Sequence, residues 1–146
     1  MTHRKQTGIT LLELMVVVAI ISLISAFAYP SYIQFVVKAK RGVGKSILMQ
    51  VADRQQQFFM DNKRYAVTLT QLGFADDPLV LADDGNVVAA GDAASVYSVS
   101  LANTSATTYT AVAAPQMNQA AKDTCGSLSL THTGAKSASG VGQDCW

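Results

Sequence analysis

The sequence predicts an α+β protein in which one long N-terminal helix packs on an antiparallel sheet of three to four strands. Three patterns support this fold class. An apolar run covers residues 9–29, an amphipathic helical pattern covers residues 43–59, and short alternating runs typical of strands follow residue 95. With 146 residues, the chain leaves room beyond the helix for one globular domain of about 80 to 100 residues.

The apolar run is long enough to cross a membrane as a helix. About 20 residues of helix span the roughly 30 Å hydrocarbon core of a bilayer, and residues 9–29 contain one strongly polar side chain, Glu13. A carboxylate in hydrocarbon lacks water and must find a partner or take up a proton. Glu13 therefore needs a functional reason. The run follows a short basic leader, residues 1–8.

The helix is expected to continue from residue 30 to about Asn62. Pro30 lacks a backbone donor and clashes with the preceding turn, so we expect a kink or a loosened backbone there. Residues 43–59 are amphipathic, a pattern more typical of a bed for a packed domain than of a ligand groove. The apolar side consists of Val43, Ile47, Leu48, Val51, Ala52, Phe58 and Phe59, and the polar side of Gln50, Asp53, Arg54, Gln57 and Asp61.

Residues 42–46 read Gly-Val-Gly-Lys-Ser, which resembles part of a phosphate-binding loop. That loop requires a further glycine where Ala39 stands, and a strand before it. The flanking pattern here is helical. We therefore interpret Gly42 and Gly44 as points of local flexibility in the helix, each costing about 1 kcal/mol relative to alanine.

After Asn62 the pattern changes from helix to loops and strands. Residues 66–94 are expected to form a loop with Asp-rich turns at 76–78 and 83–86. The acidic residues lack the spacing and the bidentate glutamate of a calcium-binding hand. We interpret them as solvated turns, and calcium binding in 76–92 stays an open alternative.

Three short runs alternate between apolar and polar side chains, as strands do. They lie at residues 97–101, 109–113 and 127–131. These strands are expected to bury one face on the apolar side of the helix. A turn is predicted at 132–135, and the Gly- and Ser-rich tail after it is expected to be held by Cys145 alone.

Cys125 and Cys145 are the two cysteines of the chain. A matched pair near the end of a small domain is typical of a disulfide in an oxidising compartment, where it adds about 3 kcal/mol, and two buried free thiols are the alternative. Basic residues flank the apolar run on both sides, so charge alone does not decide the topology. The cysteine pair favours a periplasmic C-terminal domain and a cytoplasmic leader.

No catalytic or metal site can be assembled from the residue types present. The sequence offers no nucleophile with a base, no paired carboxylates and no metal-binding cluster, and His3 lies far from His132. We therefore expect no enzyme activity and no cofactor. The formal net charge is +1, or −1 once Arg4 and Lys5 are removed with the leader, and neither value favours nucleic acid.

Residues 8–13 read Gly-Ile-Thr-Leu-Leu-Glu, and with the apolar run after them they resemble the class III signal peptides of type IV pilins and type II secretion pseudopilins. The resemblance covers residues 8–41, with Ile9 where phenylalanine is more usual. It implies that a prepilin peptidase cuts between Gly8 and Ile9 and methylates the new amino terminus at Ile9. It also implies that apolar helices bundle into a filament core, where Glu13 of one subunit neutralises the amine of a neighbour.

The C-terminal part resembles the PilE-class minor pilins of type IVa pili, in which a cysteine pair delimits the D-region. The resemblance rests on Cys-Gly-Ser-Leu-Ser-Leu from Cys125, Thr-Gly-Ala-Lys from Thr133, and the final Cys145-Trp146. It implies the type IV pilin fold in four parts. These are a cleaved leader at 1–8, a membrane and filament-core helix at 9–29, its amphipathic continuation at 30–62, and a periplasmic or extracellular domain at 63–146 with its D-region at 125–145.

By this resemblance, the chain is a structural minor subunit of a type IV pilus that supports pilus assembly, twitching motility and adhesion. Its expected partners are the prepilin peptidase, other pilins, the inner-membrane assembly platform and, before assembly, the lipid bilayer. Nucleic acid is not expected as a partner. The expected location is the inner membrane, as a single span, and the extracellular pilus.

Several other interpretations stay open. A type II secretion pseudopilin would share the N-terminal half, and a major pilin would also share the disulfide. Ala26-Phe27-Ala28 has the small-x-small form of an ordinary secretory cleavage site, which would release a soluble protein cut after Ala28, and a plain unprocessed anchor would also explain the apolar run. We expect most of the basic charge after the span against anionic lipid headgroups or in the filament, and four charges are few for duplex binding. A DNA or surface receptor would use four basic residues. These are Lys38, Lys40, Arg41 and Lys45.

Overall fold

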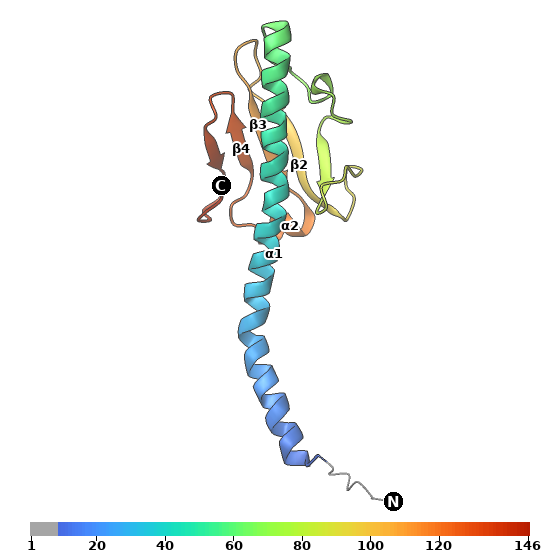
Figure 1. The fold of residues 1–146 in the computed structure, drawn as a ribbon, viewed down its shortest axis with the longest axis vertical. Coiled ribbons are helices and arrows are strands. Elements are labelled where there is room, and N and C mark those ends of the chain that lie inside the picture. Colours follow the sequence, from blue (N-terminus) through green and yellow to red (C-terminus); the bar gives the residue numbers. More distant parts are fainter. Residues whose placement is uncertain (1–8) are drawn as a thin grey trace, which may run out of the picture. The chain divides into compact units, whose positions relative to one another are not determined.

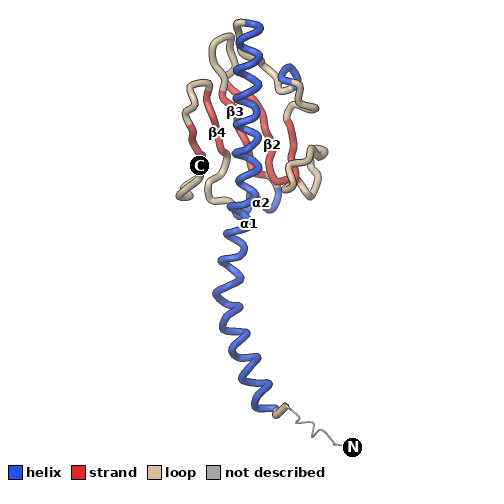
Figure 2. The backbone as a smooth tube through the Cα atoms, in the orientation of Figure 1, coloured by secondary structure: helices blue, strands red, loops and turns tan. Residues whose placement is uncertain are grey.

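The computed structural model describes residues 9–146. They form one long helix, a short 3-10 helix, five strands and a second, short helix (Figures 1 and 2). The predicted leader 1–8, with Gly8, lies outside the described residues. In chain order the elements are α1 (Leu11–Asn62), η1 (Thr70–Leu72), β1 (Leu79–Ala82), β2 (Ser95–Ala102), β3 (Thr110–Pro115), α2 (Met117–Lys122), β4 (Leu128–Thr131) and β5 (Lys136–Ala138).

The chain divides at Val36 into two compact units. The described part of the first unit, residues 9–36, is the apolar half of α1, and its helical structure continues through Pro30. Two hydroxyls in this half bond back to the preceding turn: Ser22 Oγ donates to Val18 O at 2.7 Å, and Ser31 Oγ donates to Phe27 O at 3.2 Å. These bonds satisfy the Ser22 and Ser31 hydroxyls within the helix itself. The kink at Pro30 stays a prediction.

The second unit, Val37–Trp146, contains a five-stranded antiparallel sheet in the order β1-β2-β3-β4-β5. Every strand pairs with its neighbour in sequence, so the sheet is a simple meander. In the middle of the sheet Val99 of β2 pairs with Leu79 of β1 on one side and with Ala113 of β3 on the other. The α+β fold class predicted from the sequence is confirmed, with five strands in place of three to four.

Three elements differ from the sequence prediction. The expected loop 66–94 contains η1 and β1. Strand β1 was not predicted, because all four of its residues are buried and its sequence does not alternate between apolar and polar side chains. The expected tail contains β5, which has three largely exposed residues and no apolar alternation. Helix α2 has six residues, too few to show a helical period. The three predicted strands correspond to β2, β3 and β4.

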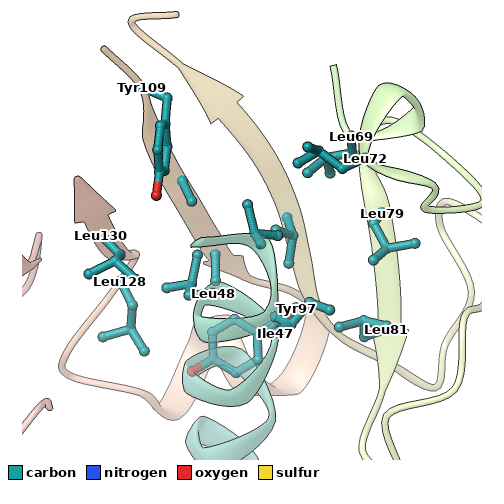
Figure 3. Close-up of a cluster of buried hydrophobic side chains, with 14 of the residues drawn as sticks. Ile47, Leu48, Leu69, Leu72, Leu79, Leu81, Tyr97, Tyr109, Leu128 and Leu130 are labelled. Carbon is teal, nitrogen blue, oxygen red and sulfur yellow. The ribbon is translucent and has the colours of Figure 1, made fainter. Parts of the chain in front are cut away.

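The second half of α1 lies across one face of the sheet and shares its core with all four longer strands (Figure 3). Of the predicted apolar side of α1, Ile47, Leu48 and Val51 are buried, and Val43, Ala52 and Phe58 pack against the core in part. The predicted bed for a packed domain is therefore present. From the sheet the core takes Leu79 and Leu81 of β1, Tyr97 and Val99 of β2, Ala111 and Ala113 of β3, and Leu128 and Leu130 of β4.

One buried amide side chain, that of Gln55, fixes the backbone just after the end of α1. Gln55 is fully buried, and its Nε2 donates to Ala66 O while its Oε1 accepts from Ala66 N–H, both at 2.9 Å. These two bonds satisfy the N–H and C=O groups of Ala66, which would otherwise be buried without a hydrogen-bond partner. The predicted amphipathic pattern did not include Gln55, because glutamine is usually exposed on a helix.

The two glycines of α1 lie in opposite environments, which makes them a matched pair. A Cβ on Gly44 would sit 3.2 Å from the ring of Tyr97, whereas nothing lies within 4 Å of a Cβ on Gly42. We expect Gly44→Val to lower the free energy of unfolding by about 1 to 3 kcal/mol through overpacking. Gly42→Val should change it by less than about 0.5 kcal/mol. Thermal unfolding of the detergent-solubilised chain, followed by near-UV circular dichroism, measures both, and equal effects would contradict this account of the helix–sheet contact.

Candidate functional site

The apolar half of α1 is exposed along almost its whole described length, with Ile33 and Val36 half-buried. Large side chains such as Leu11, Phe27 and Phe35 are 78%, 73% and 72% exposed, and no residue from 9 to 36 is buried. An 18-residue window of α1 reaches a mean hydropathy of 2.6, so by length and composition this helix could cross a membrane. Soluble monomers rarely expose an apolar surface of this extent. The segment is therefore a contact surface for lipid or for other protein chains.

The start of α1 is capped by Thr10. Its Oγ1 accepts a hydrogen bond from the backbone N–H of Glu13 at 3.2 Å. Thr10 stands directly before the first helical residue, and the Thr-x-x-Glu spacing is that of a capping box. Glu13 lies in the first helical turn, where the helix dipole favours a carboxylate. The sequence interpretation missed this role of Thr10, although the spacing could have indicated it.

In the globular unit, a buried ion pair joins α1 to the segment after α2. Arg41 Nη2 donates to Asp123 Oδ1 at 2.6 Å and Arg41 Nε donates to Asp123 Oδ2 at 3.2 Å. Both residues are buried, at 7% and 6% exposure. This two-point geometry is the strong form of an arginine–carboxylate contact. Arg41 is thus an exception to the expectation that most of the four basic residues lie against lipid headgroups or in the filament, because its charge is paired inside the domain.

Two further side chains complete what we call the Arg41–Asp123 cluster, defined by Arg41, Tyr97, Gln119 and Asp123. Tyr97 Oη donates to Asp123 Oδ2 at 2.7 Å. Gln119 Nε2 lies 3.0 Å from Val37 O, 3.0 Å from Asp123 Oδ2 and 3.3 Å from Tyr97 Oη. Gln119 belongs to α2, so the cluster fixes this short helix to the backbone of α1. Sequence alone could not find it, because its members come from three separate segments: α1, β2 and α2 with its C-cap residue Asp123.

The cluster holds its charges at neutral pH. A hydrogen bond from its guanidinium to Asp123 raises the pKa of Arg41, although burial opposes this shift. Burial also opposes ionisation of Asp123, but hydrogen bonds from Arg41, Tyr97 and the Cys125 N–H outweigh it and lower the pKa of that carboxyl. Burial and the hydrogen bond to Asp123 raise the pKa of Tyr97. The tyrosine therefore remains a neutral donor to a charged pair.

The cysteines form a disulfide between Cys125 and Cys145, 20 residues apart, with their Cα atoms 5.5 Å from each other. The predicted pairing is present in the structure. The expectation that Cys145 alone holds the tail is wrong, because β5 pairs with β4 and backbone N–H groups of Gly140 and Gly142 donate to Cys125 O and Thr124 O at 2.9 and 3.0 Å. Trp146 Nε1 adds a bond to Ser137 O at 2.7 Å.

Two family models match the chain. The model described as "Type IV minor pilin ComP, DNA uptake sequence receptor" matches residues 30–129, and that described as "Prokaryotic N-terminal methylation motif" matches residues 3–29. The chain belongs to the type IV pilin family. The resemblance found in the sequence is thereby confirmed.

The chain is also similar to two individual pilins. A type IV major pilin protein, PilA of Myxococcus xanthus (strain DK1622), is 37% identical over 73 residues, which cover 50% of this chain and 33% of that protein. The chain thus matches about a third of the length of that relative. A solved type IV pilin from Shewanella oneidensis is 20% identical, with a TM-score of 0.46 over 73% of this chain and 97% of that one.

Membership of the pilin family agrees with the exposed apolar half of α1. Pilins are structural proteins, not enzymes, and they interact with other pilins in a filament, while the N-terminal methylation motif implies processing by a prepilin peptidase. The apolar helix suits a membrane-anchored, pilus-associated pilin. Within residues 9–146, no group of three or more His, Cys, Asp or Glu side chains is placed to hold a metal ion.

The buried ion pair leads to a stability prediction. Asp123→Asn leaves the Arg41 guanidinium without its counter-charge and should lower the free energy of unfolding by about 3 to 5 kcal/mol. In the wild type the stabilisation is complete above the ordinary aspartate pKa of about 3.9 and should be lost as the pH falls through the lower pKa of the folded state.

Urea unfolding between pH 2 and pH 7 tests both expectations. The control is Asp144→Asn, which changes an exposed carboxylate and should leave stability within about 0.5 kcal/mol of wild type. Equal losses for the two variants would show that the cluster does not stabilise the domain.

Proposed function

We propose that this pilin is a minor structural subunit of a type IV pilus. The observation that carries the proposal is the apolar segment 9–36, which contains no buried residue and has Glu13 in the first turn of α1. The apolar surface of such a segment must be shielded from water. Lipid shields it before assembly, and neighbouring helices shield it after assembly. The subunit supports pilus assembly and, through the assembled pilus, twitching motility and adhesion.

Processing precedes assembly in this proposal. The prepilin peptidase cuts between Gly8 and Ile9, and Ile9 receives the methyl group. Residues 9–29 then hold the subunit in the inner membrane, with 63–146 in the periplasm, until the assembly platform moves it into the pilus. Support comes from the methylation motif at residues 3–29, from the hydropathy of α1 and from the disulfide, which is typical of an oxidising compartment.

Glu13 guides assembly rather than insertion. Near the end of the span a carboxylate is tolerated at the lipid interface, and the Thr10 cap places it in the first turn of the helix. In a filament core that holds little water, the amine of Ile9 on a neighbouring subunit is its natural counter-charge. A pair of this kind adds little net stability, but either charge left alone is costly, so the pair sets the axial register of neighbouring helices.

Assignment to the minor class rests on the family model that covers residues 30–129, which is described as a minor pilin. The short disulfide loop, with Trp146 bonded beside it, also fits the minor class. The major pilin and the type II secretion pseudopilin are the competing assignments, and the match to a major pilin spans only a third of that protein.

A DNA-uptake receptor is the second candidate function, because the description of the same family model includes that role. The basic residues of this chain give it little support. Arg41 is buried against Asp123, and Lys40 pairs with Asp83 at 3.3 Å. Two of the four charges that a receptor would use are thus already paired with carboxylates.

We expect only weak duplex binding. Fluorescence anisotropy with labelled duplexes of several sequences should give dissociation constants of about 10⁻⁶ to 10⁻⁴ M at physiological salt, similar for all sequences. A constant near 10⁻⁸ M for one sequence would show specific recognition and make the receptor the better assignment.

The central test of the proposed function is Glu13→Ala. We expect the variant protein to be processed and located in the membrane, with an intact mass that corresponds to methylated Ile9 as the first residue. Its incorporation into sheared pili should fall sharply. The physical reason is the unpaired amine, which costs on the order of 3 to 5 kcal/mol in a dry core.

Two variants control this experiment. Glu13→Asp keeps the charge on a shorter arm and should restore incorporation in part, and Asp53→Ala removes an exposed carboxylate from the other half of α1 and should assemble as wild type. Full incorporation of Glu13→Ala would contradict the pairing. A mature protein that begins at Tyr29 would replace the pilus assignment by an ordinary secreted protein.

A further inference from the structure

The two sulfurs of the disulfide lie in different surroundings. Both cysteines border the hydrophobic core, but Cys125 is fully buried, whereas Cys145 is 9% exposed. Cys145 also follows two exposed residues, Gln143 and Asp144, near the end of the chain. The rate of thiol–disulfide exchange depends on which sulfur an external thiolate can reach. A bond with one inner and one outer sulfur can therefore react unequally at its two ends.

A close backbone contact covers Cys125 on the side of the C-terminal tail. Residues 139–142 lie directly on residues 124–126, and we call this packing the tail contact. Within it the backbone N–H of Gly140 donates to Cys125 O at 2.9 Å. The tail contact continues the pairing of β4 with β5, at the side of the sheet where the chain ends (Figure 1).

Two glycines make the tail contact possible, because neither position has room for a side chain. A Cβ on Gly140 would overlap Thr124 O, and a Cβ on Gly142 would sit 2.9 Å from Cys125 Sγ. Carbon and sulfur atoms at that separation repel each other. The backbone of Gly142 therefore lies against the Cys125 sulfur and leaves no gap through which a reagent could reach it.

We propose that the disulfide is opened and formed through Cys145, the outer sulfur, while Cys125 serves as the inner sulfur. The external partner is a thiol in the opening direction and a disulfide in the forming direction. It approaches past Gln143 and Asp144, which are exposed. This inference rests on the surroundings of the two cysteines and does not depend on the assignment to a pilus.

Opening begins at the outer sulfur. An external thiolate attacks Cys145 Sγ, the bond between the two cysteines breaks, and its electron pair leaves on Cys125 Sγ, which takes up a proton as the opened tail admits water. A second external thiolate attacks the external sulfur of the mixed disulfide and releases Cys145 as a thiolate. Two external thiols are thereby oxidised to one disulfide, and the protein disulfide is reduced to two thiols.

Formation follows the same path in reverse. The Cys145 thiolate attacks an external disulfide and releases one external thiolate. Cys125 then loses its proton to water, attacks Cys145 Sγ and releases the second external thiolate. The tail contact favours this second step, because hydrogen bonds from residues 139–142 hold the tail beside Cys125 and make the step intramolecular.

A tail that detaches before it reacts is the competing explanation. Chain ends open at low cost, and a detached tail would expose both sulfurs together, so exchange would lose its preference. The closed tail is favoured here because the disulfide itself holds it until the first attack. The pairing of β5 with β4 and the bond from Trp146 Nε1 to Ser137 O at 2.7 Å hold it as well.

Glutathione identifies the attacked sulfur in the intact chain. The oxidised, full-length protein in detergent is treated briefly with reduced glutathione, quenched with acid and alkylated with a maleimide. Trypsin separates the two cysteines by cutting after Lys136, and mass spectrometry then measures the glutathione adduct on each. We expect at least about tenfold more adduct on Cys145 than on Cys125. In concentrated urea the ratio should fall to about one, since both sulfurs are then accessible.

Gly142→Ala tests whether the tail contact is what covers Cys125. The added Cβ must push the tail away from Cys125 Sγ, so the adduct ratio of the folded variant should fall toward one. The matched control is Gly42→Ala, which adds the same methyl group where nothing lies within 4 Å and should keep the wild-type ratio. Near-UV circular dichroism shows whether each variant is folded. The wild-type comparison with and without urea stands by itself if Gly142→Ala does not fold.

Three results would overturn the proposal. The first is an equal distribution of adducts, or an excess on Cys125, in the folded wild type. The second is the absence of both adducts in the folded chain when both form in urea, which would show that neither sulfur is open to attack. The third is a folded Gly142→Ala variant with the wild-type ratio. Failure of the pilus assignment would leave all three readouts unchanged, because none of them measures assembly.

Discussion

The arrangement of the globular unit depends on the buried pair of Arg41 and Asp123. An isolated charge at either position would be costly in the interior, and the pair is acceptable only because each oxygen of Asp123 has several donors. Those donors come from α1, β2 and the start of the disulfide loop, so the requirement of one carboxylate brings three parts of the chain together. The hydrogen bond of Gln119 to Val37 O then fixes α2 on the same helix.

The two halves of α1 share one continuous helical backbone but differ in how their apolar side chains are distributed. From Val37 onward the helix has an inner side that packs on the sheet and an outer side that carries charge, as a helix of a soluble domain does. Before Val37 it is apolar and contains no buried residue, and the hydroxyls of Ser22 and Ser31 bond locally to Val18 O and Phe27 O. The first half is therefore suited to contact with lipid or other chains, whereas the second half packs on the sheet of its own chain.

Sequence patterns predicted what repeats along the chain. The end of α1 at Asn62, the apolar side through Leu48 and Val51, and strands β2 to β4 followed from periodicity. Elements without a period were missed: β1 is buried on both faces, and α2 and β5 are too short. For the functional surface, the motif from Gly8 to Glu13 was sufficient to indicate a pilin. The burial of Arg41 could not be predicted, because its partner lies 82 residues away and an arginine among lysines has the pattern of a surface charge.

The meander order of the sheet has a consequence for how the chain folds. Each strand finds its partner next to it in sequence, so the sheet can form hairpin by hairpin with little loss of loop entropy. The hydrogen bonds that join α1 to Gln119 and Asp123, in contrast, connect residues 82 positions apart. Cys125 and Cys145 flank β4 and β5, which are already adjacent in the meander. Disulfide formation therefore links the ends of two strands, β4 and β5, that already pair with each other, and it does not determine the topology of the sheet.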